Sequence, residues 1–373
     1  MKTILVVLGT RPEAIKLAPV ILSLKKAGTY QVLVCNTEQQ KELSNQTLGF
    51  FGIQADFNLD VMRPNQTLAG VQARILSALS EIYAQNNIDA TIVQGDTMTV
   101  FCGALVSFYN KVPVFHVEAG LRSYNLFEPF PEEAIRQMTS RITDLHFAPT
   151  RAAQKALLNE GISEDKIFIT GNTVIDALSC LSDSVMKKAE QNLKDKGIRL
   201  DNKLVLITVH RRENHGERLN QILGAIKQLT LKYPDHQFVL PVHPNPNVKE
   251  KVCKELSQLS NVILTEPMDY PELVYMMKST KLVLTDSGGI QEEAPTFGNP
   301  VLVMRYKTER KEGVEAGFAK LVGADIKKII AESEAILSQT KTKTRKDGRK
   351  NPYGDGTAAI KIQEAINAYF QKN

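Results

Sequence analysis

The chain has 373 residues, of which 43% are hydrophobic and 23% are charged, and its formal net charge is +5 at pH 7. This composition is typical of a soluble globular protein, and the length favours two domains over one. The run KTKTRKDGRK at residues 341–350 accounts for the whole excess of positive charge, so we expect a solvated surface loop there and exclude a nucleic-acid-binding protein, which needs a basic face on its folded body.

The cysteines and the apolar runs favour a cytoplasmic location. The cysteines lie far apart and form no CxxC pair, which excludes a zinc site and a disulfide framework built on such pairs: Cys35, Cys102, Cys180 and Cys253. The first apolar run is followed at once by Arg11 and Glu13, so it is too short for a signal peptide and is predicted to be a core strand. No apolar run approaches the roughly 20 residues that a membrane-spanning helix needs.

Strand and helix patterns alternate through the first half of the chain. Short apolar runs predict strands at residues 4–8, 31–35, 90–94, 112–117, 145–148 and 167–170. Amphipathic stretches predict helices at residues 13–26, 39–50, 67–84, 98–109, 132–143 and 151–159, with another beginning at Val174. Residues 187–203 are polar and lack strong periodicity, so they are interpreted as a connection between domains.

The alternation then restarts. Strands are predicted at residues 204–209, 237–241, 262–264, 282–285 and 300–304, and helices at 218–232, 248–259, 271–278, 290–297 and 357–370. This pattern predicts an α/β protein with two doubly wound, Rossmann-like domains facing across a cleft, and ligands at the carboxyl ends of the strands. The expected domains are residues 1–186 and 187–356, with a last helical segment at 357–373.

Two cations follow the first predicted strand. Arg11 can hold a diphosphate through two parallel hydrogen bonds, and Lys16 adds a charge one turn later. The alternative is that Arg11 caps an ordinary turn and Lys16 lies on a solvated helix face. The segment is not GxGxxG, so no nicotinamide cofactor is expected. The chain also has no HExxH, GxSxG or Walker A motif, and no metal is expected.

Carboxylates gather at the other strand ends of the first half. Asp96 follows one strand and on its own reads best as a helix N-cap. Glu118 ends a buried strand, where an idle carboxylate is costly. Glu132 and Glu133 open a helix, which the helix dipole alone would explain, and Arg136 follows one turn later. Three such carboxylate positions in one domain favour a catalytic group.

The second half offers a histidine and a glycine-rich loop. His210 follows a strand beside Arg211 and Arg212, and His243 follows the next strand in a stiff loop; a lone histidine is more often structural. Ser287-Gly288-Gly289 joins a strand to a helix start, where backbone N–H groups suit a phosphate. Glu292 and Glu293 come one turn later and could take ribose hydroxyls. The alternative is that the two glycines only form a tight turn.

Ten segments occur together and in one order along the chain: GTRPEAIKLAP at 9–19, QGDT at 94–97, HVEAGLRS at 116–123, PFPEE at 129–133, FAPT at 147–150, ITGNTVIDAL at 169–178, HRREN at 210–214, PVHPNPNV at 241–248, TDSGGIQEEAP at 285–295 and NPYGDG at 351–356. As a set they resemble the non-hydrolysing UDP-N-acetylglucosamine 2-epimerase family. The resemblance implies a glycosyltransferase-B fold, a last helix that packs back toward the first domain, a homodimer, and no cofactor.

The resemblance also implies a reaction. UDP-GlcNAc and UDP-ManNAc interconvert by elimination of UDP to 2-acetamidoglucal and re-addition, supplying ManNAc units for a surface polysaccharide. By motif, the catalytic residues are the acid/base carboxylates Asp96, Glu118 and Glu132, together with His210 beside the diphosphate or the leaving oxygen. The groups that hold UDP are Arg11, Lys16, Ser287, Gly288 and Gly289 at the diphosphate and Glu293 at the ribose, with Arg136 orienting the Glu132 side or binding substrate.

One segment departs from the family pattern. The family usually reads Thr-Gly-Gln-His where this chain has Thr37-Glu38-Gln39-Gln40. This segment belongs, by resemblance, to a site for a second UDP-GlcNAc as activator, whose candidate residues here are Gln39, Gln40, Gln66 and His243. Three alternatives to a reversible epimerase stay open: a hydrolysing epimerase that releases ManNAc and UDP, a UDP-sugar-dependent glycosyltransferase, and a UDP-sugar sensor without catalysis.

Overall fold

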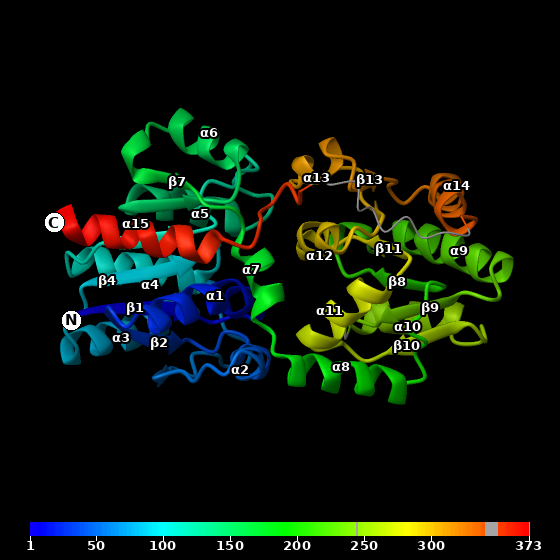
Figure 1. Cartoon of the computed structure of the whole chain (residues 1–373), viewed down its shortest axis with the longest axis horizontal. Coiled ribbons are helices and arrows are strands. Elements are labelled where there is room, and N and C mark those ends of the chain that lie inside the picture. The colour runs from blue at the N-terminus through cyan, green and yellow to red at the C-terminus, as the bar shows by residue number, and fades with distance from the viewer. Residues whose placement is uncertain (244, 340–349, 373) are drawn as a thin grey trace. The chain divides into compact units, whose positions relative to one another are not determined.

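The computed structural model describes residues 1–243, 245–339 and 350–372. The basic run predicted to be a surface loop lies outside the described residues, except for Lys350. The chain forms two compact units, one made of Met1–Leu181 with Tyr353–Asn373 and the other of Ser182–Pro352. Each unit contains one parallel sheet (Figure 1), which confirms the predicted α/β class with two parallel sheets.

The N-terminal unit is built on a seven-stranded parallel sheet in the order β3-β2-β1-β4-β5-β6-β7. The chain reverses its direction of strand addition between β1 and β4, which are paired, and such a switch point is where ligands bind in open α/β sheets. Its elements are β1 Lys2–Leu8, α1 Arg11–Ala27, β2 Tyr30–Asn36, α2 Lys41–Phe50, β3 Phe57–Asn58, α3 Leu68–Gln85, β4 Ala90–Gln94, α4 Met98–Tyr109, β5 Val114–Val117, α5 Glu132–Arg141, β6 Leu145–Ala148, α6 Arg151–Asn159, the 3₁₀ turn Glu164–Lys166, β7 Ile167–Ile169, α7 Thr173–Cys180 and α15 Ala358–Lys372.

The C-terminal unit repeats this plan with a six-stranded sheet in the order β10-β9-β8-β11-β12-β13. Its switch point lies between the paired strands β8 and β11. Its elements are α8 Asp183–Asp195, β8 Leu204–Thr208, the 3₁₀ turn Arg212–Asn214, α9 Glu217–Lys232, β9 Gln237–Pro241, α10 Pro246–Leu256, β10 Val262–Thr265, α11 Tyr270–Ser279, β11 Leu282–Thr285, α12 Gly288–Glu293, the 3₁₀ turn Ala294–Phe297, β12 Val301–Val303, α13 Lys311–Glu315, β13 Ala319–Leu321 and α14 Ile326–Leu337.

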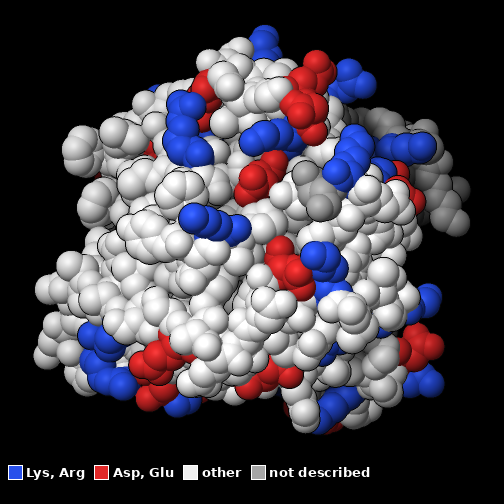
Figure 2. Space-filling view, turned by 90° about the vertical axis from the view of Figure 1, so that its left-hand side faces the viewer, with Lys and Arg blue, Asp and Glu red and all other residues white. Residues whose placement is uncertain are grey.

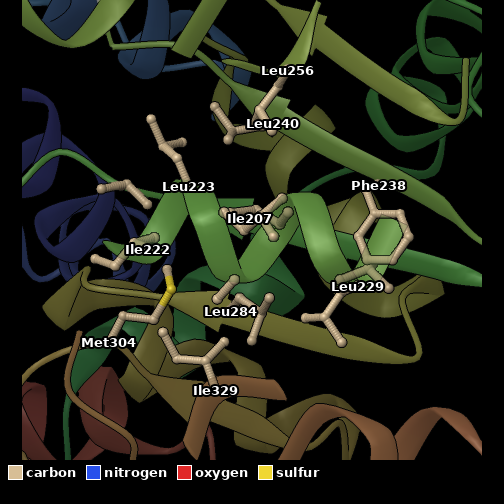
Figure 3. Packing of buried hydrophobic residues seen from close by; sticks show 14 of the residues in the cluster. Ile207, Ile222, Leu223, Leu229, Phe238, Leu240, Leu256, Leu284, Met304 and Ile329 are labelled. Atoms are coloured by element: carbon tan, nitrogen blue, oxygen red, sulfur yellow. The ribbon is translucent and has the colours of Figure 1, made fainter. Parts of the chain in front are cut away.

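The core of the C-terminal unit shows why its strands read as continuous apolar runs. Side chains of β8, α9 and β9 interdigitate in one layer (Figure 3), and Ile207, Ile222 and Phe238 are completely buried. A parallel sheet is covered on both faces, so its strands carry no polar alternation. Full burial of each such side chain stabilises the fold by about 1.5–3 kcal/mol.

The predicted connection at residues 187–203 differs from the structure, because its first part is helical. Helix α8 runs from Asp183 to Asp195, and the side chain of Ser182 caps its start. Only Ala189 and Leu193 of this helix are buried. Such a narrow apolar stripe carries little periodic signal in the sequence.

The last helix belongs to the N-terminal unit, where α15 packs against α1 (Figure 1). Asp176 of α7 accepts a hydrogen bond from the backbone N–H of Ala359 at 2.9 Å, in the first turn of α15. The backbone N–H of Asn172 donates to the carbonyl of Tyr353 at 2.7 Å. The returning chain passes close to Gly171, whose φ is +90°, where a Cβ would lie 3.3 Å from the Cα of Gly354. A side chain at Gly171 would therefore obstruct the docking of α15.

Candidate active site

The N-terminal unit brings three of the predicted residues to one edge of its sheet. Arg11, Asp96 and Glu118 follow β1, β4 and β5, which are neighbours in the sheet. The carboxyl ends of parallel strands meet at the same edge, so these residues lie around the switch point. Lys16 and Arg136 reach the same edge from α1 and α5, where they pair with Glu118 and Asp96.

Glu118 is the most constrained of these residues. Its backbone φ is +63°, a left-handed conformation that costs a non-glycine residue on the order of 1–3 kcal/mol. Its side chain is 7% exposed and ion-paired with Lys16. The carboxylate also accepts hydrogen bonds from the amides of Gln94 and Asn172, the latter at 3.3 Å. Such strain in a buried, fully held carboxylate is typical of a functional position.

Asp96 is held by Arg136. The guanidinium Nη2 lies 2.6 Å from Asp96 Oδ2, and Nε donates to the same oxygen at 2.8 Å. Arg136 also contacts Glu133 at 3.2 Å, and Glu133 accepts from the backbone N–H of Ser123 at 2.8 Å. Arg136 therefore orients Asp96, and it contacts Glu133, which binds the Ser123 loop. The expected role of Arg136 on the Glu132 side or at the substrate stays a prediction.

Glu132 is the first residue of α5, and one oxygen of its carboxylate is buried. Among the described residues, Glu132 Oε2 is buried and has no hydrogen-bond partner. An unpaired buried carboxylate oxygen is costly, so a donor that arrives with a ligand would stabilise it. This is consistent with the acid/base role expected for Glu132.

Glu13 is a further buried carboxylate, to which the sequence analysis assigned no role. It lies in the first turn of α1 and forms a capping box with Thr10. Its Oε2 accepts from the backbone N–H groups of Gly9 and Thr10 at 2.7 and 2.9 Å, and its Oε1 accepts from the hydroxyl of Thr97. Burial raises the pKa of Glu13 to about 7, although each of these donors lowers it.

The C-terminal unit forms a similar edge from β9, β8 and β11, which are neighbours and are followed by His243, His210 and Ser287. Asp286 directly follows β11 and is completely buried. It accepts from the backbone N–H groups of His210 and Arg211 at 3.1 and 2.9 Å and from the amide of Asn214 at 3.0 Å. Asp286 therefore fixes the loop that carries His210.

The imidazole of His210 lies between an acid and a second imidazole. Its Nδ1 is 3.3 Å from Asp286 Oδ1, and its ring stacks on His243 with centroids 6.2 Å apart. Burial lowers the pKa of His210, and the positive charge of Arg211 acts in the same direction, against the charge of Asp286. The loop thus favours a neutral His210 at neutral pH, able to carry a proton in either direction.

The turn Ser287-Gly288-Gly289 packs against the guanidinium group of Arg310. A Cβ on Gly288 would lie 2.9 Å from the guanidinium carbon of Arg310, so glycine is needed for this approach. Arg310 donates from Nε to Glu292 at 2.9 Å. Glu292 is thus an ion-pair partner of Arg310, and Glu293 is buried next to it. Ser287 is the N-cap residue of α12, and Gly289 follows in its first turn.

The candidate activator residues fall into separate places. Gln40 Oε1 accepts from the backbone N–H of Arg11 at 3.0 Å, and Gln39 accepts from the hydroxyl of Thr99 at 3.0 Å, so both lie at the edge of the N-terminal sheet. Gln66 accepts from the backbone N–H of Arg63 at 2.9 Å, just before α3. His243 belongs to the other unit.

The departure at Glu38 keeps the backbone shape that glycine would favour. Glu38 has a φ of +60°, a conformation that glycine adopts without strain. Its carboxylate accepts from the amide of Asn45 at 2.8 Å and lies 3.7 Å from Lys41 Nζ. These contacts offset the strain, so the loop is maintained without a glycine.

Several residues of these edges were missed in the sequence analysis. Glu13, Gln94, Glu133 and Asp286 lie inside or beside the quoted motifs but received no role there. For Asp286 the signal was present, because it directly follows a buried strand as Glu118 does. For Glu13 the spacing Thr10-x-x-Glu13 signals a capping box, but it does not indicate the link to Thr97.

The described parts of the two units contain no metal centre and no membrane span. Among the described residues, no group of three or more His, Cys, Asp or Glu side chains is arranged to hold a metal ion. No helix in the described ranges is both long and apolar enough to cross a bilayer.

Comparison with known proteins gives one consistent result. Residues 22–367 match the family model described as UDP-N-acetylglucosamine 2-epimerase. The chain is 45% identical over 368 residues to a UDP-N-acetylglucosamine 2-epimerase of Neisseria meningitidis, covering 97% of this chain and 98% of the relative, and 44% identical over 367 residues to that of Escherichia coli K12, with the same coverage.

The same similarity holds in three dimensions. The crystal structure of the Neisseria meningitidis UDP-GlcNAc 2-epimerase bound to UDP-GlcNAc aligns with a TM-score of 0.89, with 45% identity over 100% of both chains. The Methanocaldococcus jannaschii UDP-GlcNAc 2-epimerase in complex with UDP-GlcNAc and UDP aligns with a TM-score of 0.82, with 34% identity over 99% of this chain and 100% of that one.

Proposed function

Because this chain belongs to the UDP-N-acetylglucosamine 2-epimerase family, we propose that it interconverts UDP-GlcNAc and UDP-ManNAc without a cofactor, as a source of ManNAc units for a surface polysaccharide. The observation that carries the proposal is the pair Glu118 and Asp96 at neighbouring strand ends. Each is a carboxylate held by a cation, Lys16 in one case and Arg136 in the other. Carboxylates fixed in this way can exchange protons with a bound sugar.

The chemistry of C2 explains why the nucleotide must leave. No carbonyl activates the C2 proton, so its direct removal would be very slow. Cleavage of the C1–O bond passes the bonding electrons to UDP and leaves positive charge at C1, which acidifies the C2 proton. A carboxylate removes that proton to give 2-acetamidoglucal. An acid then protonates the opposite face of C2 while UDP adds back to C1, which completes the inversion.

The proton-transfer groups in this proposal are Asp96, Glu118 and Glu132. One of them acts as the base and another, on the opposite face of the sugar, as the acid. Lys16 forms an ion pair with Glu118 and holds that carboxylate in place. The unpaired buried oxygen of Glu132 is suited to a donor on the substrate.

The departing UDP needs its own set of groups. We assign the diphosphate to Arg11, Lys16 and the turn Ser287-Gly288-Gly289, and the ribose to Glu293. His210 would stabilise the leaving oxygen, and the buried Asp286 supports this role because it fixes both the backbone and the ring of His210. The reaction requires these groups and the carboxylates to act on one substrate molecule.

Turnover of UDP-GlcNAc in D2O tests the proposal. We expect UDP-ManNAc to form with deuterium at C2, and free UDP to stay far below the amount of product. Free UDP rising in proportion to turnover would indicate a hydrolysing epimerase instead. Turnover that requires an added acceptor would indicate a glycosyltransferase, and binding of UDP-GlcNAc without deuterium at C2 would indicate a sensor.

The same assay tests the activator site. Gln39, Gln40 and Gln66 are proposed to contact a second UDP-GlcNAc, together with His243. Reactions started from UDP-ManNAc should then accelerate when a small amount of UDP-GlcNAc is added. Gln40 contacts the backbone of Arg11, which supports coupling between this segment and the diphosphate group. An unchanged initial rate would contradict activation in this chain.

We also propose that the protein is a homodimer. Figure 2 shows a face of the N-terminal unit on which a broad area carries no Lys, Arg, Asp or Glu side chain. The same unit exposes the aromatic rings of Phe108 and Tyr109 at the end of α4. Interface cores are depleted of charged residues and enriched in aromatic ones. Sedimentation in solution should give twice the chain mass of 41.5 kDa, and a single species at 41.5 kDa would contradict the dimer.

A further inference from the structure

The carboxylate of Glu13 joins two loops that come from different parts of the chain. On one side it binds the backbone of Gly9 and Thr10, in the loop after β1. On the other side it accepts from the hydroxyl of Thr97, in the loop after β4. Glu13 is 2% exposed, so these contacts are made out of water, where hydrogen bonds to an ionised group are strong.

The loop after β1 is tightly packed, and Glu13 is one of its anchors. A Cβ on Gly9 would lie 2.0 Å from the hydroxyl oxygen of Thr37, so Gly9 is packed directly against β2's end. The Gly9 carbonyl accepts from the backbone N–H of Gln40 at 2.7 Å. Its N–H is the group that Glu13 holds. The position of Arg11, two residues later, therefore depends on what happens at Glu13.

We propose that Glu13 is a positioning residue whose ionised carboxylate holds the Arg11 loop and the Asp96 loop at the spacing that the reaction needs. The inference rests on the proposed function, because it assigns Arg11 to the diphosphate and Asp96 to proton transfer. Glu13 acts through Gly9, Thr10 and Thr97, and no direct contact with substrate is required. Errors of about 1 Å in such spacing lower turnover by about 10²-fold.

Protonation gives this link a dependence on pH. With a pKa of about 7, Glu13 gains a proton as the pH falls through neutrality. A protonated oxygen no longer accepts as before, so the contact to Thr97 or the contact to Gly9 and Thr10 weakens. The neighbouring titratable groups are Lys16 on the same helix, paired with Glu118, and Asp96 next to Thr97, paired with Arg136.

The raised pKa of Glu13 also makes the stability of the fold depend on pH. The folded-state value of about 7 lies above the model value of 4.5. The stabilisation that protonation of Glu13 gives to the fold is therefore fully present below pH 4.5 and is lost as the pH rises through 7. The wild type should lose stability over this range relative to Glu13→Gln, which does not titrate.

The experiment compares the wild type with Glu13→Gln, Thr97→Val and Thr97→Ser between pH 5 and 9. We expect kcat of Glu13→Gln to fall about 5- to 10-fold at pH 8 and to lose the part of the acid limb that lies near pH 7. Thr97→Val, which breaks the link and leaves the capping box, should lower kcat about 10-fold with KM changed less than about 2-fold. Thr97→Ser keeps the hydroxyl that donates to Glu13, so its kcat should equal that of the wild type.

Two controls separate positioning from simple stability. Thr150→Ala removes the N-cap of α6 in the same unit, where Thr150 accepts from Ala153 N at 3.2 Å, and should lower Tm without changing kcat. As the pH rises from 5 to 8, the Tm of the wild type should fall relative to the Tm of Glu13→Gln. A flat difference, or a wild-type pH profile of kcat in Glu13→Gln, overturns the inference. Absence of turnover in the wild type would instead contradict the proposed function, and the Tm difference would still decide whether Glu13 titrates.

Discussion

Replacement of Glu118 by Gln is expected to lower kcat by about 10³-fold or more, because the side chain keeps its shape but can no longer exchange a proton. The fold should tolerate the change. The new amide oxygen can accept from Lys16 and Asn172. The new NH2 group can donate to the side-chain oxygen of Gln94 if the Gln94 amide flips. Binding of UDP, measured by calorimetry, should stay within about 3-fold of the wild type, since Glu118 is not assigned to the nucleotide.

Two further variants make this result specific. Asp96→Asn removes the other strand-end carboxylate and should also lose most of its turnover while it still binds UDP. Glu160→Gln removes a carboxylate that pairs with the buried Arg122 at 2.7 Å in the same unit. It should lower Tm and leave turnover within about 2-fold of the wild type. Near-normal turnover of Glu118→Gln or Asp96→Asn would remove that residue from the proposed mechanism.

Asp286→Asn is expected to destabilise the C-terminal unit by about 2–4 kcal/mol and to weaken UDP binding strongly. Asp286 is completely buried and faces N–H donors from His210, Arg211 and Asn214. An asparagine would turn its own NH2 group toward some of these donors and leave them unpaired. The negative charge that raises the pKa of His210 would also be lost, so that pKa should fall further.

Chemical denaturation and UDP calorimetry measure the two effects together. Asp325→Asn is the matched control, because Asp325 caps α14 in the same unit and accepts from Lys328 N at 3.0 Å. That variant should lose about 0.5–1 kcal/mol of stability and keep its affinity for UDP. If Asp286→Asn were as stable as Asp325→Asn and bound UDP normally, the loop at His210 would not depend on Asp286.

The long, strongly patterned elements were predictable from the sequence because apolar runs and helical stripes repeat in them. Strands such as Ala90–Gln94 and Gln237–Pro241 have the predicted bounds. Three elements between residues 305 and 339 were not predicted, namely α13, β13 and α14. Strand β13 has three residues, too few for any period, whereas α14 carries an N-cap at Asp325 and an apolar stripe that could have been recognised.

In the candidate site, too, only some features could be predicted from the sequence. The strand-end positions of Arg11, Asp96, Glu118 and His210 follow from topology alone, because parallel strands end at one edge. Their partners do not. Nothing in the sequence indicates that Arg136 reaches Asp96, 40 positions away, or that Asp286 holds the backbone of His210 from 76 positions away. Such contacts depend on side-chain packing in three dimensions. The periodicity of a sequence describes a single helix or strand and does not show which distant elements come into contact.

The interrupted N-terminal unit has a consequence for how the chain folds. Its last helix, α15, is separated from α7 by the whole of Ser182–Pro352. While that insert is unfolded, docking α15 must close a disordered loop of roughly 170 residues, and the entropy of closure opposes it by a term that grows as (3/2)RT ln n. Once the insert is compact, that loop is short. Folding of the inserted unit therefore lowers the entropic cost of docking α15 in the unit that surrounds it. The two units should unfold with more cooperativity than two domains joined by a single linker.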